Sequence, residues 1–159
     1  MVKIIFSLIL FYFLAIIQTS FLVHYGIKGG LLNLVLISII LFNFFEKKES
    51  KLGFIVAVTG GFYLDIFSPY FPGLFTLLGI ATACLIKLLK PFFEIKKFVS
   101  FIIILFVALL FYEIILTLAT LNYGFFSHIF SLIYNFLISI FVYFLIKTFY
   151  VAIQKRTRK

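Results

Sequence analysis

Charged residues are scarce in this chain, and so are the groups from which most catalytic sites are built. Only 12% of its 159 residues are charged, with five acids and one cysteine, whereas soluble domains carry about 25% charged residues. The lone Cys84 excludes an intrachain disulfide and is expected to be an inert buried thiol. The sequence contains no nucleophile–base set, no glycine-rich phosphate loop and no cysteine cluster. We therefore expect a protein that is not an enzyme and binds no cofactor.

Apolar residues take the place of the missing charges. They make up 65% of the chain, and the mean hydropathy is +1.27. Soluble domains are about 45–50% apolar, and a chain of this length could not bury so much more. The sequence therefore predicts an all-α integral membrane protein, with residues 1–159 forming one polytopic transmembrane domain.

Six apolar runs are separated by short connections. A transmembrane helix needs about 20 apolar residues, and we expect a bundle of six, over residues 4–23, 31–45, 52–67, 74–89, 98–121 and 127–153. The first run could be a signal peptide, but its length and the runs that follow favour an uncleaved helix. The third and fourth are short and share a proline-containing turn, so a re-entrant hairpin is an alternative to two spans.

The basic residues predict the orientation. With the N-terminus in the cytoplasm, 13 of the 14 Lys and Arg residues fall on the cytoplasmic side, and Lys28 alone lies outside. This asymmetry predicts six spans with both termini in the cytoplasm. The net charge of +9 is placed at the ends of apolar runs, which indicates contact with membrane lipids and not with nucleic acid. Lys87, at the end of the fourth run, is expected to reach toward the headgroups.

Asp65 and Glu113 are the only acids within apolar runs. Counting 1.5 Å per helical residue places both in the outer half of the membrane. Two carboxylates at similar depth could serve acid–base chemistry, a proton path or cation binding. The favoured interpretation is that each anchors helix packing, and Lys28 is a candidate ion-pair partner for either.

The two acids have different expected partners. Asp65 can accept hydrogen bonds from backbone amides of the turn that follows it, as aspartates at turns do. For Glu113, the nearby candidate partners are Tyr112, Thr117 and Thr120.

Small residues recur every four positions before Asp65. Gly53, Ala57 and Gly61 lie on one helical face, and Asp65 is the next member of the series. Such a stripe lets helix backbones approach closely in lipid, either within the protein or against another one, and the internal contact is favoured. Gly79 and Ala83 show the same four-residue spacing of small residues in the fourth run. Ser68-Pro69 is expected to end the third helix.

Amides and histidines complete the polar groups. Interhelical hydrogen bonding is the favoured role of the amides, with a polar ligand pocket as the alternative. These amides are Gln18, Asn33, Asn43, Asn122 and Asn135. His24 and His128 have no Cys, Asp or Glu at ligand spacing and do not predict a metal site.

The segment Gly61–Ser68, followed by Pro72-Gly73-Leu74, resembles the motif of the rod-shape-determining membrane protein family MreD. That motif is a glycine, an apolar segment with an aspartate, a serine, and a turn ending in glycine–leucine. Gln18 is similar to the family's glutamine at the end of helix one. The chain departs from the family at Leu32-Asn33, where many members have a proline followed by an aspartate.

The resemblance implies a subunit of the bacterial elongation machinery in the inner membrane, with a fold similar to the S components of energy-coupling-factor transporters. Such a subunit binds MreC, a single-span protein, and works with MreB, RodA and penicillin-binding-protein synthases. The matching motif positions are Gly61, Asp65, Ser68 and Gly73, none of them catalytic.

The sequence and the resemblance together suggest three alternative functions. The first is a scaffold that binds MreC and helps maintain cell shape by positioning peptidoglycan synthesis. The second is a small-molecule-binding transporter component, with Gln18 and Glu113 in its polar core. The third is a proton-coupled permease, which requires Asp65 and Glu113 to face one cavity. The scaffold is the favoured interpretation.

Overall fold

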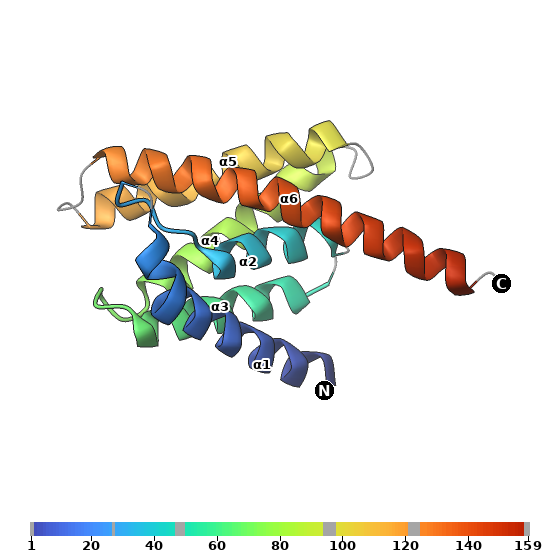
Figure 1. Cartoon of the computed structure of the whole chain (residues 1–159), viewed down its shortest axis with the longest axis horizontal. Helices are drawn as coiled ribbons and strands as arrows, with labels where there is room; N and C mark the ends of the chain where they lie inside the picture. The colour runs from blue at the N-terminus through green and yellow to red at the C-terminus, as the bar shows by residue number, and fades with distance from the viewer. Residues whose placement is uncertain (1, 27, 47–49, 94–97, 121–124, 158–159) are drawn as a thin grey trace.

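The computed structural model describes residues 2–26, 28–46, 50–93, 98–120 and 125–157, and these residues contain α-helices and no β-strand (Figure 1). The helices run in chain order as α1 (Val2–Ile16), α2 (Leu34–Phe45), α3 (Leu52–Phe67), α4 (Leu74–Leu89), α5 (Phe98–Thr120) and α6 (Phe125–Thr157). The predicted all-helical class is confirmed over this part of the chain. Asn122 and six of the basic residues used for the orientation lie outside it: Lys47, Lys48, Lys96, Lys97, Arg158 and Lys159.

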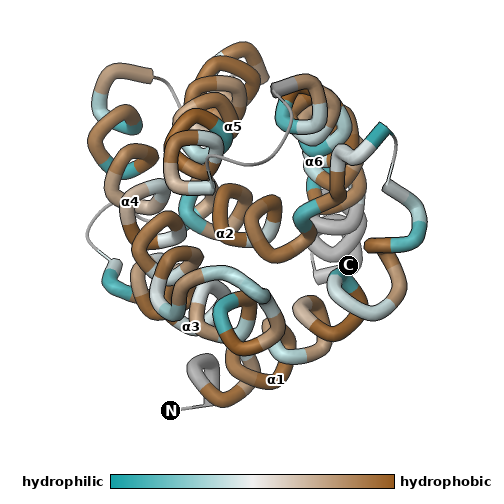
Figure 2. Tube along the Cα trace, turned by 90° about the vertical axis from the view of Figure 1, so that its left-hand side faces the viewer, coloured by the Kyte–Doolittle hydropathy of each residue, from teal (hydrophilic) through white to brown (hydrophobic). Residues whose placement is uncertain are grey.

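Four helical segments are long and apolar enough to cross a membrane. They are Ile5–Tyr25, Leu74–Phe92, Phe98–Thr120 and Phe126–Thr148. Helices α2 and α3 are shorter, with 12 and 16 residues. Hydrophobic residues predominate along the helices (Figure 2), and many large hydrophobic side chains are exposed, as expected of a protein surrounded by lipid.

Helix α2 lies at the centre of the bundle and contacts each of the other five α-helices (Figure 2). Eight of its residues are buried. Because the amides at a helix start have no partner within the helix, other segments must supply one. Gln18 Oε1 accepts from the amide of Val35 at 3.1 Å, and Asn33 Oδ1 accepts from that of Leu36 at 2.9 Å. Side chains therefore cap α2 inside the protein.

The predicted helix boundaries agree best with the structure where turn residues interrupt the chain. The predicted ranges 52–67 and 74–89 are confirmed as α3 and α4. The first helix was expected to be regular to residue 23, but α1 ends at Ile16 and continues as a π-helical turn, Ile17–Phe21 (η1), and a 3₁₀ turn, Leu22–Tyr25 (η2). Helix α6 ends at Thr157, beyond the expected residue 153.

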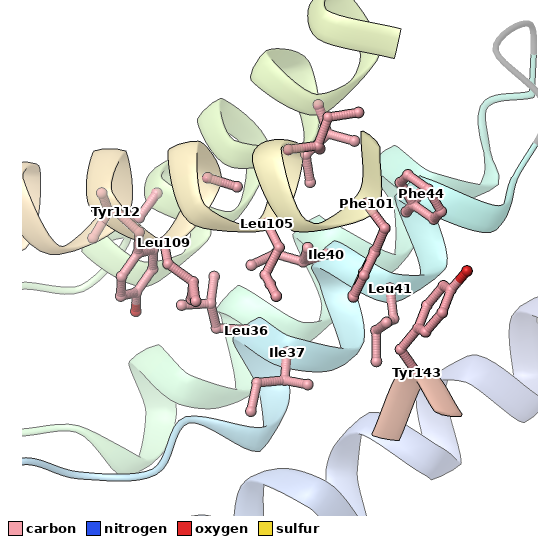
Figure 3. Close-up of a cluster of buried hydrophobic side chains, with 14 of the residues drawn as sticks. Leu36, Ile37, Ile40, Leu41, Phe44, Phe101, Leu105, Leu109, Tyr112 and Tyr143 are labelled. Carbon is pink, nitrogen blue, oxygen red and sulfur yellow. The ribbon is translucent and has the colours of Figure 1, made fainter. Parts of the chain in front are cut away.

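Two apolar clusters hold the bundle together. One joins α2, α4, α5 and α6 and contains a group of aromatic rings (Figure 3). In it, the rings of Phe101 and Tyr143 stack with centroids 4.1 Å apart, and Phe44 meets Phe101 edge-on at 5.1 Å. The second joins α1, α2, α3 and α4 around small residues that include Ala57 and Ala83. Polar side chains gather at two opposite ends of the bundle, next to these apolar clusters.

Candidate functional site

Asp65 joins the end of α3 to the start of α4. Its Oδ1 accepts from the amide of Phe75 at 2.8 Å, and its Oδ2 accepts from the amide of Thr76 at 3.0 Å and the hydroxyl of Thr76 at 2.5 Å. The acid therefore binds the open amides at the N-terminus of α4, where the helix dipole also favours negative charge. The predicted anchoring role is supported, but the donors belong to the next helix and not to the turn itself.

The turn between these helices contains two further motif residues, Ser68 and Gly73. Ser68 ends α3, and its Oγ accepts from the amide of Tyr70 at 3.2 Å. Gly73 precedes α4 with a φ of +92°, in the left-handed region that favours glycine. Both residues shape the turn that presents α4 to Asp65.

The small-residue stripe is an internal contact, as predicted. A Cβ placed on Gly61 would lie 2.4 Å from Thr76 Cα, and one on Gly79 would lie 3.0 Å from the carbonyl oxygen of Ala57. These positions pack α3 against α4. Gly53 differs from this, because its Cβ would meet Asn43 and Glu46. The stripe therefore serves two contacts: Gly61 packs against the start of α4, and Gly53 packs against the C-terminal end of α2.

Glu113 has partners that the sequence analysis missed. Its Oε2 lies 2.9 Å from His128 Nδ1, and its Oε1 accepts from Ser131 Oγ at 2.7 Å. The predicted partners were wrong: Thr117 donates to the backbone oxygen of Glu113 at 2.7 Å. Thr120 likewise donates to the backbone oxygen of Leu116, and Tyr112 accepts from Asn33 Nδ2 at 3.1 Å.

The network around Glu113 continues to the start of α2. Asn135 Nδ2 donates to Ser131 Oγ at 3.1 Å, and Asn135 Oδ1 accepts from the amide of Asn33 at 2.7 Å. His128, Ser131 and Asn135 follow one another at i, i+3 and i+7 on α6, so they share one face of that helix. This spacing is the sequence signal that could have identified them as partners of an acid elsewhere.

A cavity of about 160 Å³ opens beside this network. Five parts of the chain contribute side chains to it, and Gln18 and Glu113, the two candidates for a polar core, both line it. Asp65 does not, although its partner Phe75 does. The full lining comprises Gln18, Gly29, Leu31, Asn33, Tyr70, Phe75, Tyr112, Glu113, Leu116, Ser127, His128 and Ser131.

The geometry fits binding better than nucleophilic catalysis. In a serine triad the histidine lies between the acid and the serine, and takes the serine's proton. Here Glu113 lies between the other two, and Ser131 donates to the carboxylate. His128 Nε2 is buried and has no hydrogen-bond partner in the described structure. Ser131 is therefore not activated by the imidazole.

A second buried polar group lies at the opposite end of α2, α3 and α4. Glu46 Oε2 accepts from the amide of Gly53 at 2.8 Å and lies 3.6 Å from Lys87 Nζ. Lys87 also donates to the carbonyl of Ser50, and Lys90 donates to that of Glu46. Lys87 was expected to reach toward headgroups, but this cluster holds it, and its ammonium lies 4.2 Å from the centroid of the Phe54 ring.

The remaining predictions about polar residues are confirmed in part. Interhelical hydrogen bonding is confirmed for Gln18, Asn33 and Asn135, and Asn43 donates to the carbonyl of Gly53 at 3.2 Å. Lys28 was a candidate ion-pair partner for Asp65 or Glu113, but its Nζ lies 5.1 Å from the centroid of the Phe130 ring. No group of three or more metal-ligating side chains occurs within the described residues.

Comparison of the chain with protein-family models, with curated proteins and with solved structures found no match in any of the three. The function is therefore argued from the residues and their contacts.

Proposed function

We propose that this chain is a multi-pass scaffold of the bacterial inner membrane, with six transmembrane helices and both termini in the cytoplasm. It binds the single-span protein MreC and helps maintain cell shape by positioning peptidoglycan synthesis. MreB, RodA and the penicillin-binding-protein synthases act with it through that complex.

The contact of Asp65 with α4 is the observation that carries this proposal. The carboxylate accepts three hydrogen bonds from Phe75 and Thr76, so it serves the fold and not a reaction. The residues on which the resemblance rests thus build one rigid element, the α3–α4 hairpin. A fixed shape is what a scaffold needs in order to present a surface to a partner.

The outer face of this hairpin provides such a surface. On α3, Phe62 and Ile66 are each 56% exposed, and because each follows a residue of the small-residue series, they lie on a neighbouring face of the helix and not on the face that packs against α4. Leu77 on α4 is 69% exposed. An apolar face of this kind accepts a transmembrane helix as readily as lipid, because close packing decides helix association in membranes.

The test is to weaken the hairpin and to measure complex formation. Asp65→Asn and Gly61→Leu are expected to reduce co-purification of MreC and to produce rounded cells. Leu118→Ile, on α5 and outside the hairpin at a 68% exposed position, is the control and is expected to leave both unchanged. The hairpin is not the contact surface if Asp65→Asn and Gly61→Leu keep both rod shape and the complex at normal levels of the protein.

The cavity beside Glu113 favours a second candidate, a small-molecule-binding transporter component. Its lining of amide, hydroxyl and carboxylate groups is what a polar ligand requires. The permease has less support, because it needs Asp65 and Glu113 to face one cavity, whereas Asp65 lies outside the lining.

A further inference from the structure

Glu113 is the one carboxylic acid among the described residues that line the cavity. Glu113 is 5% exposed, and the described lining contains no lysine or arginine. Its carboxylate accepts two hydrogen bonds, from Ser131 and His128, although two carboxylate oxygens offer about four lone-pair positions. Two positions are therefore left for a donor in the cavity.

His128 contacts the same carboxylate through one ring nitrogen. Its Nδ1 lies 2.9 Å from Glu113 Oε2, and its Nε2 is buried without a partner in the described structure. The imidazole therefore occupies one lone-pair position of the carboxylate and leaves others open to a donor in the cavity.

The rest of the lining suits an organic cation. Tyr70 and Phe75 bring aromatic rings, with centroids 5.8 Å apart, to the wall, and ring faces attract ammonium groups. Tyr112 accepts from Asn33 through its hydroxyl oxygen, which leaves the hydroxyl hydrogen to bind an oxygen of the ligand. Aromatic rings beside one carboxylate are typical of ammonium recognition and not of metal binding.

The size of the cavity limits the ligand. At about 160 Å³, it is close to an engineered cavity of about 150 Å³ that holds benzene, a molecule of about six non-hydrogen atoms. A primary ammonium joined to a hydroxyl or ester oxygen by two carbons fits this volume. That group exists as free ethanolamine and as the headgroup of phosphatidylethanolamine. Lys28 is exposed and directly precedes Gly29 of the lining, so a lipid phosphate has a cation next to that wall.

We propose that this cavity binds a primary ammonium group, with Glu113 as its counter-ion and Tyr112 as donor to the neighbouring oxygen. The site stands apart from the scaffold role, because none of its polar groups is a motif residue of the hairpin. It deepens the second candidate function by naming the class of ligand, and it rests on the cavity being a ligand site.

The experiment uses the full chain in nanodiscs. In phosphatidylcholine discs, free ethanolamine is titrated by calorimetry against ethylene glycol, which replaces the ammonium by a hydroxyl. Ethanolamine is expected to bind at least tenfold more tightly. Glu113→Gln is expected to weaken its binding by about tenfold or more, as loss of a charge-assisted contact does. Thr120→Val, on the same helix but outside the lining, is the control and should bind normally.

A second arm distinguishes the source of the ammonium. Native mass spectrometry after reconstitution in mixed discs is expected to show phosphatidylethanolamine retained over phosphatidylcholine by the unmodified chain and not by Glu113→Gln. Leu116→Phe, which fills the cavity and leaves Glu113 in place, should also lose it. Lipid retention without binding of free ethanolamine identifies the headgroup, and the reverse identifies a soluble amine. The proposal is overturned if neither binds, if ethylene glycol binds equally well, or if Glu113→Gln changes nothing.

Discussion

Asp65 and Glu113 are both carboxylates in apolar helices, yet their partners give them different roles. Asp65 is held by two backbone amides and one hydroxyl at a helix N-terminus, where the donors are fixed by the helix itself. Glu113 is held by two side chains of α6 and faces a cavity. Fixed donors make a structural contact, whereas side-chain donors beside an open volume leave room for a ligand.

The hydrogen bonds of Asp65 predict a graded loss of stability. Asp65→Ala removes all three acceptor contacts and is expected to cost about 2–4 kcal/mol, because each hydrogen bond to a charged group contributes about 1.5–3 kcal/mol and the freed amides can partly rehydrate at the membrane edge. Thr76→Val removes only the hydroxyl and should cost about 1 kcal/mol. Thermal unfolding of the detergent-solubilised chain measures both. Equal loss in the two variants would contradict this order.

The sequence identified both acids, came close to the donors of Asp65 and missed those of Glu113. Asp65 lies 10 residues from Phe75 across a short turn, so local reasoning about turns brought the donors close to their true position. Glu113 meets His128 and Ser131 across 15 and 18 residues, on another helix. The rotation of α6 about its axis decides that contact, and no local preference encodes it.

At the scale of elements, the α3–α4 hairpin was the most predictable part of the fold. Gly73 and the Ser68-Pro69 step define its turn through backbone restrictions that depend on residue type alone. The end of α1 was less predictable. There, Gln18 turns its side chain to the amide of Val35, within a π-helical turn that tertiary contact maintains. When contacts with another helix decide where a helix ends, the residues of that helix alone do not predict its boundary.

The closeness of α3 and α4 predicts a difference between two glycines. Gly61→Ala would place a Cβ 2.4 Å from Thr76 Cα, and because that neighbour is backbone, the helices must separate. We expect a loss of about 1–3 kcal/mol, the usual cost of overpacking. Gly79→Ala meets the Ala57 carbonyl at 3.0 Å and should cost less. Thermal unfolding compares them, with Val58→Leu as the exposed control, and a smaller loss for Gly61→Ala than for Gly79→Ala would be evidence against the predicted contact.

At the scale of the whole molecule, the bundle is organised around its shortest α-helix. Helix α2 touches all the others, and its 12 residues extend about 18 Å, less than the roughly 30 Å of the hydrocarbon layer. Its first amides are satisfied by side chains of η1 and of its own cap, so the helix can start below the headgroups. Helix α6 is the opposite case: its 33 residues extend about 50 Å, and its C-terminal end projects beyond the bundle (Figure 1).

Because helix lengths alone do not fix the number of membrane crossings, the number is measured by cysteine labelling. Six crossings predict a specific labelling pattern. In a Cys84→Ala background, single cysteines are placed by Lys28→Cys, Lys51→Cys, Phe71→Cys and Lys147→Cys, all at exposed positions. A membrane-impermeant maleimide added to spheroplasts is expected to label positions 28 and 71, and to label 51 and 147 only after permeabilisation. A permeant maleimide that labels all four is the control for reactivity.

Failure to label position 71 from outside, with 28 labelled, would indicate that α3 and α4 form a re-entrant hairpin. Labelling of 28 and 51 from the same side would show that α2 does not cross. Since the charge asymmetry alone is compatible with a re-entrant α3–α4 hairpin, position 71 is the measurement that separates six spans from four.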